Sequence, residues 1–410
     1  MTKETTFAVA DIGSTKITGL IASKNDREEL EVLGCGTIPV EDVFRKGILT
    51  NIERTSKALK LSLSMAEEQA DLKISNLTIG FSGEHLRSFN SLGVVPVTKN
   101  ENQITEYEVE RVIEAAQAVS LPFEREILHV LPQEFFIDQG DGIKDPIGNT
   151  GVRLEVQVHI VTASSAATQA IYKAVRDTGY EITNLVLNPI VIGSALLSAE
   201  EEEVGTLLID IGGNTSDLAV YSKGAIRHTA SIGMGGRFVT NDIAVGLQIP
   251  VSQAESIKVA SGHAFAAAVN PEEMIDIPGI GGRKPAKVSR MLLASIIEAR
   301  MEEIFRMAKA AAERSGYAGK LSCGVVLTGG GAKLRGVDKL AQKVFGLPAK
   351  IGYPEKIHLP EEIYGKPEYS AAIGLLAYGL RHPVESGEKH NIFVRMFHKV
   401  EDAISSLFNI

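Results

Sequence analysis

The fold is decided by two similar stretches, Asp11-Ile12-Gly13-Ser14-Thr15-Lys16 and Asp210-Ile211-Gly212-Gly213-Asn214-Thr215. Each follows an apolar run, 7–10 or 207–209, and leads into a second apolar segment, so each is predicted to be a strand–turn–strand unit. Glycine permits backbone angles that point successive N–H groups at an anion. The aspartate at the strand end repels phosphate, but it can hold a hydrated Mg²⁺ that bridges to phosphate. The repeat therefore predicts two similar halves that clamp a nucleotide.

Two further segments extend the predicted site. The apolar run 325–328 leads into Gly329-Gly330-Gly331 and then Ala332-Lys333-Leu334, which predicts a strand, a turn and a helix. Consecutive glycines let the backbone lie flat against a base or ribose, and a helix N-terminus favours negative charge. Glu255 and Lys258 lie three residues apart on one face of an expected helix, a spacing that suits hydrogen bonds to ribose hydroxyls.

In this order, the segments resemble the motifs of the actin-like ATPase superfamily, which has two phosphate motifs, an adenosine motif and two connecting helices. The connecting helices would contain 189–196 and 369–377, whose small residues permit a close crossing between the halves. Ordinary glycine turns and core helices explain any one segment, but five in the family's order make that explanation weak. The resemblance implies an α/β fold with an actin-like duplicated ATPase core, in which two RNase H-like halves surround a nucleotide cleft.

Length and composition set further limits. The 410 residues allow about two to four domains. The net charge of −9 argues against a nucleic-acid partner, which would favour a basic face. The sequence has no basic N-terminal stretch followed by an apolar one, and no uninterrupted run approaching about 18 apolar residues. A cytoplasmic protein without a signal peptide or membrane span is therefore expected.

The stretch from about Gly83 to Thr162 is predicted to lie outside the nucleotide core. It contains an expected helix at 106–119 and the segments Leu131-Pro132-Gln133-Glu134-Phe135, Gly142-Ile143-Lys144-Asp145-Pro146-Ile147-Gly148 and Gly151-Val152-Arg153-Leu154-Glu155. These segments closely resemble the insertion subdomain of the FtsA family of bacterial cell-division proteins. The resemblance extends from Phe7 to about Tyr378. It implies an insertion that replaces a subdomain of actin and lies on the other side of the molecule.

The resemblance also gives an expected domain organisation. The first nucleotide-core half comprises 1–82 with 163–203 and 369–380, and the FtsA-type insertion subdomain comprises 83–162. The second half comprises 204–235 with 321–368, and its own insertion comprises 236–320. The polar residues 381–390 are expected to be a linker to a helix at 391–410. Within these units, further helices are expected at 53–70 and 289–313, and strands at 77–81 and 152–160.

The helix expected from Ser289 to Glu313 offers a candidate docking surface. Its apolar residues Ile296, Ile297, Met301, Ile304 and Phe305 are predicted to face inward, and Glu298, Arg300, Glu303 and Arg306 to be exposed. A charged face is most often only solvated. The resemblance nevertheless implies that this region docks the C-terminal peptide of the tubulin-like ring protein FtsZ, with Arg300 and Glu303 as candidate contacts.

Residues 391–410 carry an apolar stripe at helical spacing, formed by Phe393, Met396, Phe397, Val400, Ile404, Leu407 and Phe408. A C-terminal helix packed on the core is one explanation. The preceding linker and the three phenylalanines favour an amphipathic helix that binds reversibly to the inner face of the membrane, and the FtsA family ends in such a helix. Arg395 and Lys399 are offset by Glu401 and Asp402, so attraction to anionic lipid should be weak.

The predicted cofactors are ATP and Mg²⁺, with the metal held through water by Asp11 and Asp210. The predicted cofactor-binding residues are Asp11, Gly13, Ser14, Thr15, Lys16, Asp210, Gly212, Gly213, Asn214, Gly236, Glu255, Lys258, Gly329, Gly330, Gly331 and Lys333. Lys16 is the expected neutraliser of phosphate charge. No catalytic residue is predicted, and hydrolysis is expected to be slow at most.

The resemblance implies a protein that polymerises and tethers FtsZ filaments to the cytoplasmic side of the cell membrane at the division site. The expected partners are FtsZ, membrane lipids, further copies of this chain and other division proteins. The closest alternative is a pilus-assembly adaptor with the same fold and insertion. A metabolite kinase is less favoured, because no segment supplies a carboxylate base for an acceptor hydroxyl. An MreB-like shape protein would lack the Gln133-Glu134 region and a C-terminal helix on a linker.

Overall fold

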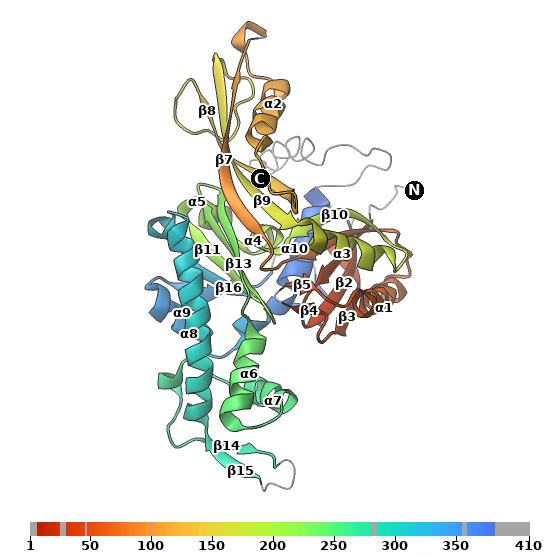
Figure 1. Ribbon diagram of the computed structural model, residues 1–410, viewed down its shortest axis with the longest axis vertical. Helices are drawn as coiled ribbons and strands as arrows, with labels where there is room; N and C mark the ends of the chain where they lie inside the picture. The colour runs from red at the N-terminus through yellow and green to blue at the C-terminus, as the bar shows by residue number, and fades with distance from the viewer. Residues whose placement is uncertain are drawn as a thin grey trace.

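Two five-stranded sheets form the centre of the protein (Figure 1). The computed structural model describes residues 6–24, 30–45, 47–98, 100–279, 285–354 and 359–381. The expected tail helix at 391–410, and the expected linker apart from Arg381, lie outside these described residues. None of the helices within the described ranges is both long enough and apolar enough to cross a bilayer.

The two sheets have the same topology. The first is ordered β10-β6-β1-β2-β3, with β1 (Thr6–Ile12), β2 (Lys16–Lys24), β3 (Leu30–Pro39), β6 (Asn76–Phe81) and β10 (Glu181–Leu187). The second is ordered β17-β16-β11-β12-β13, with β11 (Thr206–Ile211), β12 (Ser216–Ser222), β13 (Ala225–Ile232), β16 (Gly324–Thr328) and β17 (Ala349–Ile351). β1 pairs antiparallel with β2 and parallel with β6, as β11 does with β12 and β16. This repeat confirms the predicted duplicated α/β core.

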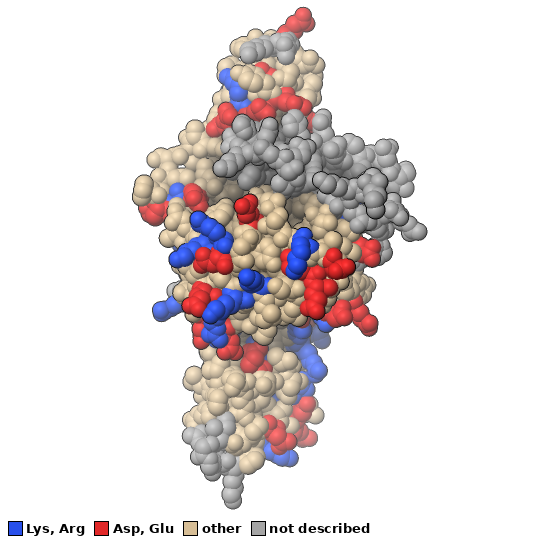
Figure 2. All heavy atoms as spheres, turned by 90° about the vertical axis from the view of Figure 1, so that its right-hand side faces the viewer, with Lys and Arg blue, Asp and Glu red and all other residues tan. Residues whose placement is uncertain are grey.

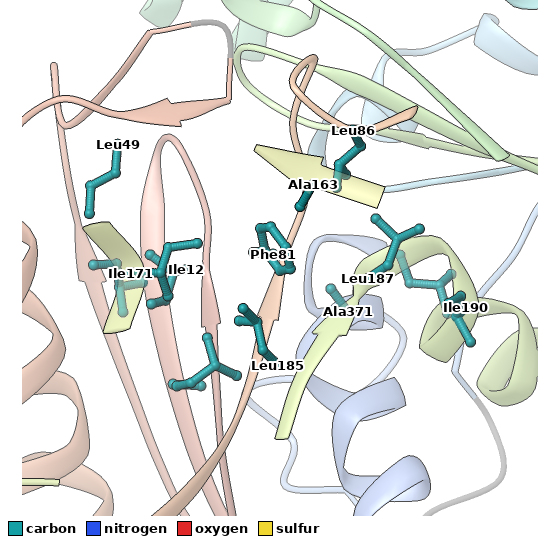
Figure 3. Packing of buried hydrophobic residues seen from close by; sticks show 14 of the residues in the cluster. Ile12, Leu49, Phe81, Leu86, Ala163, Ile171, Leu185, Leu187, Ile190 and Ala371 are labelled. Atoms are coloured by element: carbon teal, nitrogen blue, oxygen red, sulfur yellow. The ribbon is translucent and has the colours of Figure 1, made fainter. Parts of the chain in front are cut away.

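Helices cover and connect the two sheets. They are α1 (Ile52–Ala70), α3 (Ser165–Arg176), α4 (Asn188–Leu196), α5 (Ala199–Val204), α9 (Val337–Phe345) and α10 (Ser370–Arg381). The short strands β4 (Phe44–Arg45) and β5 (Ile48–Leu49) form a hairpin that contacts α3. The connecting helices α4 and α10 cross closely, because a Cβ at Gly374 would lie 2.4 Å from the Val191 carbonyl oxygen. Figure 3 shows Phe81, Leu187, Ile190 and Ala371 gathered where these helices meet the first sheet.

The first insertion is a three-stranded sheet with one helix, at one end of the molecule in Figure 1. It contains β7 (Arg87–Pro96), α2 (Glu106–Gln117), β8 (Arg125–Ile137) and β9 (Arg153–Ser164), with β9 between the other two strands. α2 lies on one face of the sheet, where a Cβ at Gly93 would be 2.1 Å from the Val112 carbonyl oxygen. The other side contacts β13, since Gln133 Nε2 donates to the Ile226 carbonyl at 2.7 Å.

The second insertion forms the opposite end of the molecule (Figure 1). It contains α6 (Gly236–Leu247), α7 (Val251–Ser261), the hairpin β14 (Met274–Ile277) and β15 (Ala286–Ser289), and α8 (Arg290–Arg314). Ile297, Met301, Ile304 and Phe305 of α8 are fully buried, as predicted, whereas Ile296 is half-buried.

The prediction that Glu298 and Arg300 are exposed is wrong, because both side chains are half-buried. Glu298 accepts a hydrogen bond from Lys343 Nζ at 2.9 Å, and Arg300 Nε donates to Asp242 Oδ2 at 2.6 Å. Ion pairs to neighbouring helices therefore hold these two charged residues against the protein.

Candidate functional site

The two predicted hairpins have the same turn geometry. Gly13 and Gly212 each donate their backbone N–H to the carbonyl three residues later, at 3.1 and 2.9 Å. The turns also touch each other, because the Asn214 N–H donates to Ser14 Oγ at 3.0 Å across 200 residues of sequence. A Cβ at Gly213 would lie only 2.3 Å from Thr15 Cγ2. The structure therefore brings the two predicted phosphate-binding turns together at one place between the sheets.

Three carboxyl groups lie behind these turns: those of Asp11 and Asp217 are buried, and that of Asp210 is half-buried. Asp11 lies near the end of β1, and one of its carboxylate oxygens accepts a hydrogen bond from Asn188 Nδ2 at 3.0 Å. Burial raises the pKa of Asp11. Asp210 on β11 pairs with Asp217 on β12 across the hairpin. Burial, together with the nearby charges of Asp217 and Asp11, raises the pKa of Asp210 to about 8, and burial raises the pKa of Asp217 to about 6. Such a cluster favours either protonation or a bound cation.

The donor set fits a hydrated Mg²⁺ better than a closed metal cage. In the part of the chain that the structure describes, no group of three or more His, Cys, Asp or Glu side chains has metal-binding geometry. Mg²⁺ usually keeps several waters and uses only one or two carboxylates. Asp11 and Asp210, the predicted pair, can supply these, and the metal's charge would offset the repulsion among the three acids.

Lys16 supplies a positive charge beside the first hairpin. Its Nζ is buried without a hydrogen-bond partner among the described residues, and it lies 3.4 Å from the centroid of the Tyr369 ring. Burial lowers the pKa of Lys16 to about 8, although the charges of Asp11 and Glu368 oppose this shift. A buried ammonium without a hydrogen-bond acceptor is costly, so the position fits an anion such as phosphate.

The triple glycine has a more specific structural role than predicted. Gly329 has a positive φ of 81°, and a Cβ there would lie 2.1 Å from Asp210 Oδ1. A Cβ at Gly331 would lie 2.3 Å from Ile211 Cγ2, so both glycines let this loop pack on β11. At Gly330 the nearest atom to a Cβ would be 4.0 Å away, which leaves this residue beside open space. The last two of these glycines begin a 3₁₀ turn, Gly330–Lys333, and the expected α-helix begins only at Val337.

Gly236, Glu255 and Lys258 lie beside the second hairpin. The Gly236 N–H donates to the Gly212 carbonyl at 2.9 Å. Lys258 Nζ donates to the Gly236 carbonyl at 3.1 Å and to Glu255 Oε2 at 2.7 Å, and Thr240 Oγ1 also bonds to both side chains. The structure therefore joins the predicted ribose-binding pair to the predicted phosphate-binding turn.

Four residues of this site were not predicted: Asn188, Asp217, Glu368 and Tyr369. Asp217 could have been found by counting along the hairpin, because it is the residue that pairs with Asp210 on the returning strand. Glu368 accepts a hydrogen bond from Lys333 Nζ at 2.6 Å. Asn188, Glu368 and Tyr369 precede or begin the connecting helices α4 and α10, and no local sequence pattern indicates that they reach the hairpins.

The other predicted contact residues lie away from the hairpins or outside the described part. Arg300 and Glu303 lie on α8, where Arg300 Nη1 donates to Glu303 Oε2 at 2.6 Å. The apolar tail residues from Phe393 to Phe408 fall outside the described ranges. On the face drawn in Figure 2, the described Lys and Arg side chains are interspersed with Asp and Glu.

Two family models match the chain. The model for "Cell division protein FtsA" matches residues 207–374, and the model for "SHS2 domain inserted in FTSA" matches residues 83–162. The second match coincides with the unit formed by β7, α2, β8 and β9.

Full-length relatives extend this similarity over most of the chain. The cell division protein FtsA of Pseudomonas aeruginosa is 38% identical over 371 residues, which cover 90% of this chain and 88% of the relative. The FtsA of Borreliella burgdorferi is 40% identical over 369 residues, covering 90% and 89% of the two chains. The FtsA of Escherichia coli K12 is 35% identical over 376 residues, covering 90% and 89%.

Solved structures with the same fold are more distant in sequence. A chain of the PilM-PilN type IV pilus biogenesis complex superposes with a TM-score of 0.65 at 17% identity, covering 91% of this chain and 98% of that one. MreB5 of Spiroplasma citri bound to AMPPNP gives a TM-score of 0.56 at 15% identity, covering 98% and 99%. The MamK double helical filament gives a TM-score of 0.51 at 12% identity, covering 91% and 98%. These structures identify an actin-like fold, and the curated relatives and family models show that the chain belongs to the FtsA family of cell division proteins.

Proposed function

We propose that this protein binds ATP with Mg²⁺ between its two hairpins. The observation that carries the proposal is the meeting of two like turns beside three carboxyl groups, two of them buried, and one buried lysine ammonium that has no hydrogen-bond acceptor within the described chain. Phosphate satisfies both needs, because it accepts hydrogen bonds from the turns and from Lys16 and it binds the metal. Mg²⁺ supplies charge neutralisation when bound.

Each predicted residue then has a role in the proposed complex. Residues 13–16 and 212–214 cradle the phosphates, and Asp11 and Asp210 orient waters on the metal. Gly329, Gly330, Gly331 and Lys333 border the adenosine, with Gly330 beside the open space that a ligand would fill. Gly236, Glu255 and Lys258 face the ribose. The AMPPNP bound to the MreB5 relative in fold supports this assignment by analogy only.

Calorimetric titration of the full chain with Mg·ATP tests the proposal. Asp210→Asn keeps the shape of the side chain but removes the metal-orienting charge, and Asp210→Ala removes both. We expect either change to weaken binding about tenfold or more. Asp141→Ala changes an exposed acid in the first insertion and should bind like the wild type. A folded wild-type protein that binds no Mg·ATP would contradict the proposal.

We further propose that the protein polymerises and tethers FtsZ filaments to the cytoplasmic side of the membrane at the division site. Membership of a cell-division family supports this role, and the apolar stripe of residues 391–410 offers a membrane-binding surface. Stacking of subunits head to tail would be a heterologous contact that need not close, as in a filament. Other division proteins are then further partners.

The second insertion is the proposed docking surface for the C-terminal peptide of FtsZ. Two exposed apolar side chains, Val245 on α6 and Leu292 on α8, belong to helices that pack against each other there. Arg300 and Glu303 add charge on α8. A short peptide usually gains affinity from an apolar groove between helices with charged contacts at its rim.

A further inference from the structure

Two of the predicted ligand lysines, one from each half, converge on adjacent residues at the start of α10. Lys16 Nζ lies 3.4 Å from the centroid of the Tyr369 ring, and Lys333 Nζ donates to Glu368 Oε1 at 2.6 Å. Glu368 and Tyr369 belong to the 3₁₀ turn Pro367–Tyr369, which runs directly into α10. This short turn therefore contacts both halves of the candidate site.

Both halves hold the Tyr369 ring in place. The turn is attached to the second half, because the Gly329 N–H donates to the Pro367 carbonyl at 3.2 Å and Thr328 Oγ1 lies 2.8 Å from Ser370 Oγ. The ring itself packs against the apolar cluster of the first half that includes Phe7 and Ile373. The ring is thus a fixed surface at the junction of the two halves.

The Tyr369 ring is one of the groups that attract the Lys16 ammonium, and the charges of Asp11 and Glu368 attract it as well. A cation over the face of an aromatic ring is attracted by the ring's quadrupole. An ammonium has three N–H donors, so one directed at the ring leaves the others for an anion on another side. The charge of Asp11 also attracts Lys16, and Lys16 Nζ has no hydrogen-bond partner within the described ranges, Asp11 included. The ring therefore keeps the ammonium available.

We propose that Tyr369 is a positioning residue for nucleotide binding, whose ring holds the Lys16 ammonium ready for a phosphate group and apart from Asp11. This inference rests on the proposed binding of ATP. The contact is made by the face of the ring, so an aromatic replacement keeps the effect and an aliphatic replacement loses it. The tyrosine hydroxyl has no part in the contact.

Calorimetric titration with Mg·ATP of two full-chain variants tests the inference. Tyr369→Phe keeps the ring and should bind within about twofold of the wild type. Tyr369→Leu keeps an apolar side chain without a ring and should bind about tenfold more weakly, because the Lys16 side chain must then be ordered when phosphate binds. Wild-type affinity in Tyr369→Leu, or an equal loss in Tyr369→Phe, would overturn the inference.

A double-mutant cycle separates positioning of Lys16 from simple packing of the ring. In a Lys16→Met background the ring has no ammonium to hold, so Tyr369→Leu should cause no further loss of Mg·ATP affinity. An equal loss of Mg·ATP affinity in both backgrounds would mean that the ring only supports the core. That result would overturn this inference but leave the proposed binding of ATP intact. Absence of Mg·ATP binding by the wild type would instead overturn the proposed function and this inference with it.

A fluorescence measurement gives an independent readout. The chain contains no tryptophan, so Tyr369→Trp places a single tryptophan ring beside Lys16. Its emission should change on titration with Mg·ATP, because the phosphate alters the position and charge environment of the ammonium. The change should disappear after Lys16→Met. Unchanged emission in a Tyr369→Trp variant that binds Mg·ATP by calorimetry would contradict the proposal.

Discussion

His129 illustrates how burial sets the state of a single residue. It lies on β8, and its Nε2 accepts a hydrogen bond at 3.1 Å from the backbone N–H of Leu187, the last residue of β10. Burial lowers the pKa of His129 to about 4, against about 6.5 for an exposed histidine. The unfolded chain therefore binds the proton more tightly than the folded one. The preference of folded His129 for its neutral form therefore contributes fully to the free energy of unfolding above about pH 6.5. This contribution is lost as the pH falls toward 4.

His129→Gln tests this reasoning, because glutamine can accept the same N–H without titrating. Lowering the pH from 7.5 to 5 should cost the wild type about 2 kcal/mol of unfolding free energy that the variant does not lose. Urea unfolding at the two pH values measures the difference. The raised pKa values of Asp210 and Asp217 act in the opposite direction, but they are common to both proteins and cancel in the comparison. A difference in stability that does not change with pH would contradict the prediction.

The positions of residues were predictable from sequence where a local pattern carries them. Asp11 and Asp210 stand at strand ends before glycine turns, as the sequence predicts, and their roles stay a prediction. The position of Tyr369 was not predictable, because its relation to Lys16 depends on where α10 begins in space, and no nearby residue records that position.

The close crossing of α4 and α10 predicts different effects for alanine at two glycine positions of α10. A Cβ at Gly374 would lie 2.4 Å from the Val191 carbonyl oxygen, whereas at Gly379 of the same helix the nearest atom would be 3.5 Å away, in Phe7. Alanine favours a helix over glycine by about 1 kcal/mol at either position. The Gly379→Ala variant should therefore melt at or above the wild-type temperature. The Gly374→Ala variant should lose about 1 to 3 kcal/mol of unfolding free energy, because its added methyl group forces the two helices apart. Circular dichroism melts give both values, and equal behaviour of the two variants would refute the close crossing.

Elements with strong periodicity were predicted well, and short ones were not. The helix expected at 53–70 is α1, Ile52–Ala70, and the helix expected at 289–313 is α8, Arg290–Arg314. The hairpin of β14 and β15 was not predicted, because strands of four residues with charged positions show no clear alternation. The helix after the triple glycine begins later than expected, because the chain first makes a 3₁₀ turn against β11.

Over the whole molecule, the Gln133-Glu134 pair joins the first insertion to the second half. Gln133 Nε2 donates to the Ile226 carbonyl at 2.7 Å, and Glu134 Oε2 accepts from the buried Arg227 at 2.9 Å. His159 Nε2 lies 3.0 Å from Thr229 Oγ1 on the same strand, β13. Sequence resemblance marked this pair as typical of the family, but its partner strand is about 90 residues away, so the contact could not be inferred from spacing.

The proposed tether can be tested with the full chain, purified FtsZ and lipid vesicles in a flotation assay. The wild type with Mg·ATP should float with the vesicles and bring FtsZ with it. The seven apolar side chains of the tail each contribute about 1 to 2 kcal/mol before ordering costs, so Phe397→Glu with Phe408→Glu should release the protein and FtsZ together. Added salt should release only part of the wild type. If the double variant still floats, the result would contradict membrane binding through the tail and favour the alternative of a helix packed on the core.

A second pair of variants separates the two contacts of the tether. Arg300→Glu should leave the protein on vesicles but reduce the FtsZ that it carries about tenfold, because it reverses a charge at the proposed docking surface. Arg306→Glu changes an arginine of the same helix that is 73% exposed and should have little effect. Melting temperatures control for the lost ion pair between Arg300 and Asp242. If the Arg300→Glu variant carries as much FtsZ as the wild type, the proposed interface at Arg300 is contradicted.

The first insertion leaves the core and returns to it at a single place. β7 begins at Arg87 and β9 pairs that residue with Thr162, so the entering and leaving chains run side by side. A tight hairpin could bridge this gap without lengthening or shortening any strand of the two central sheets. A module grafted through this junction would therefore keep the strands of both central sheets, but it would also have to supply partners for the buried Arg227 and for the Leu187 N–H, which Glu134 and His129 now satisfy.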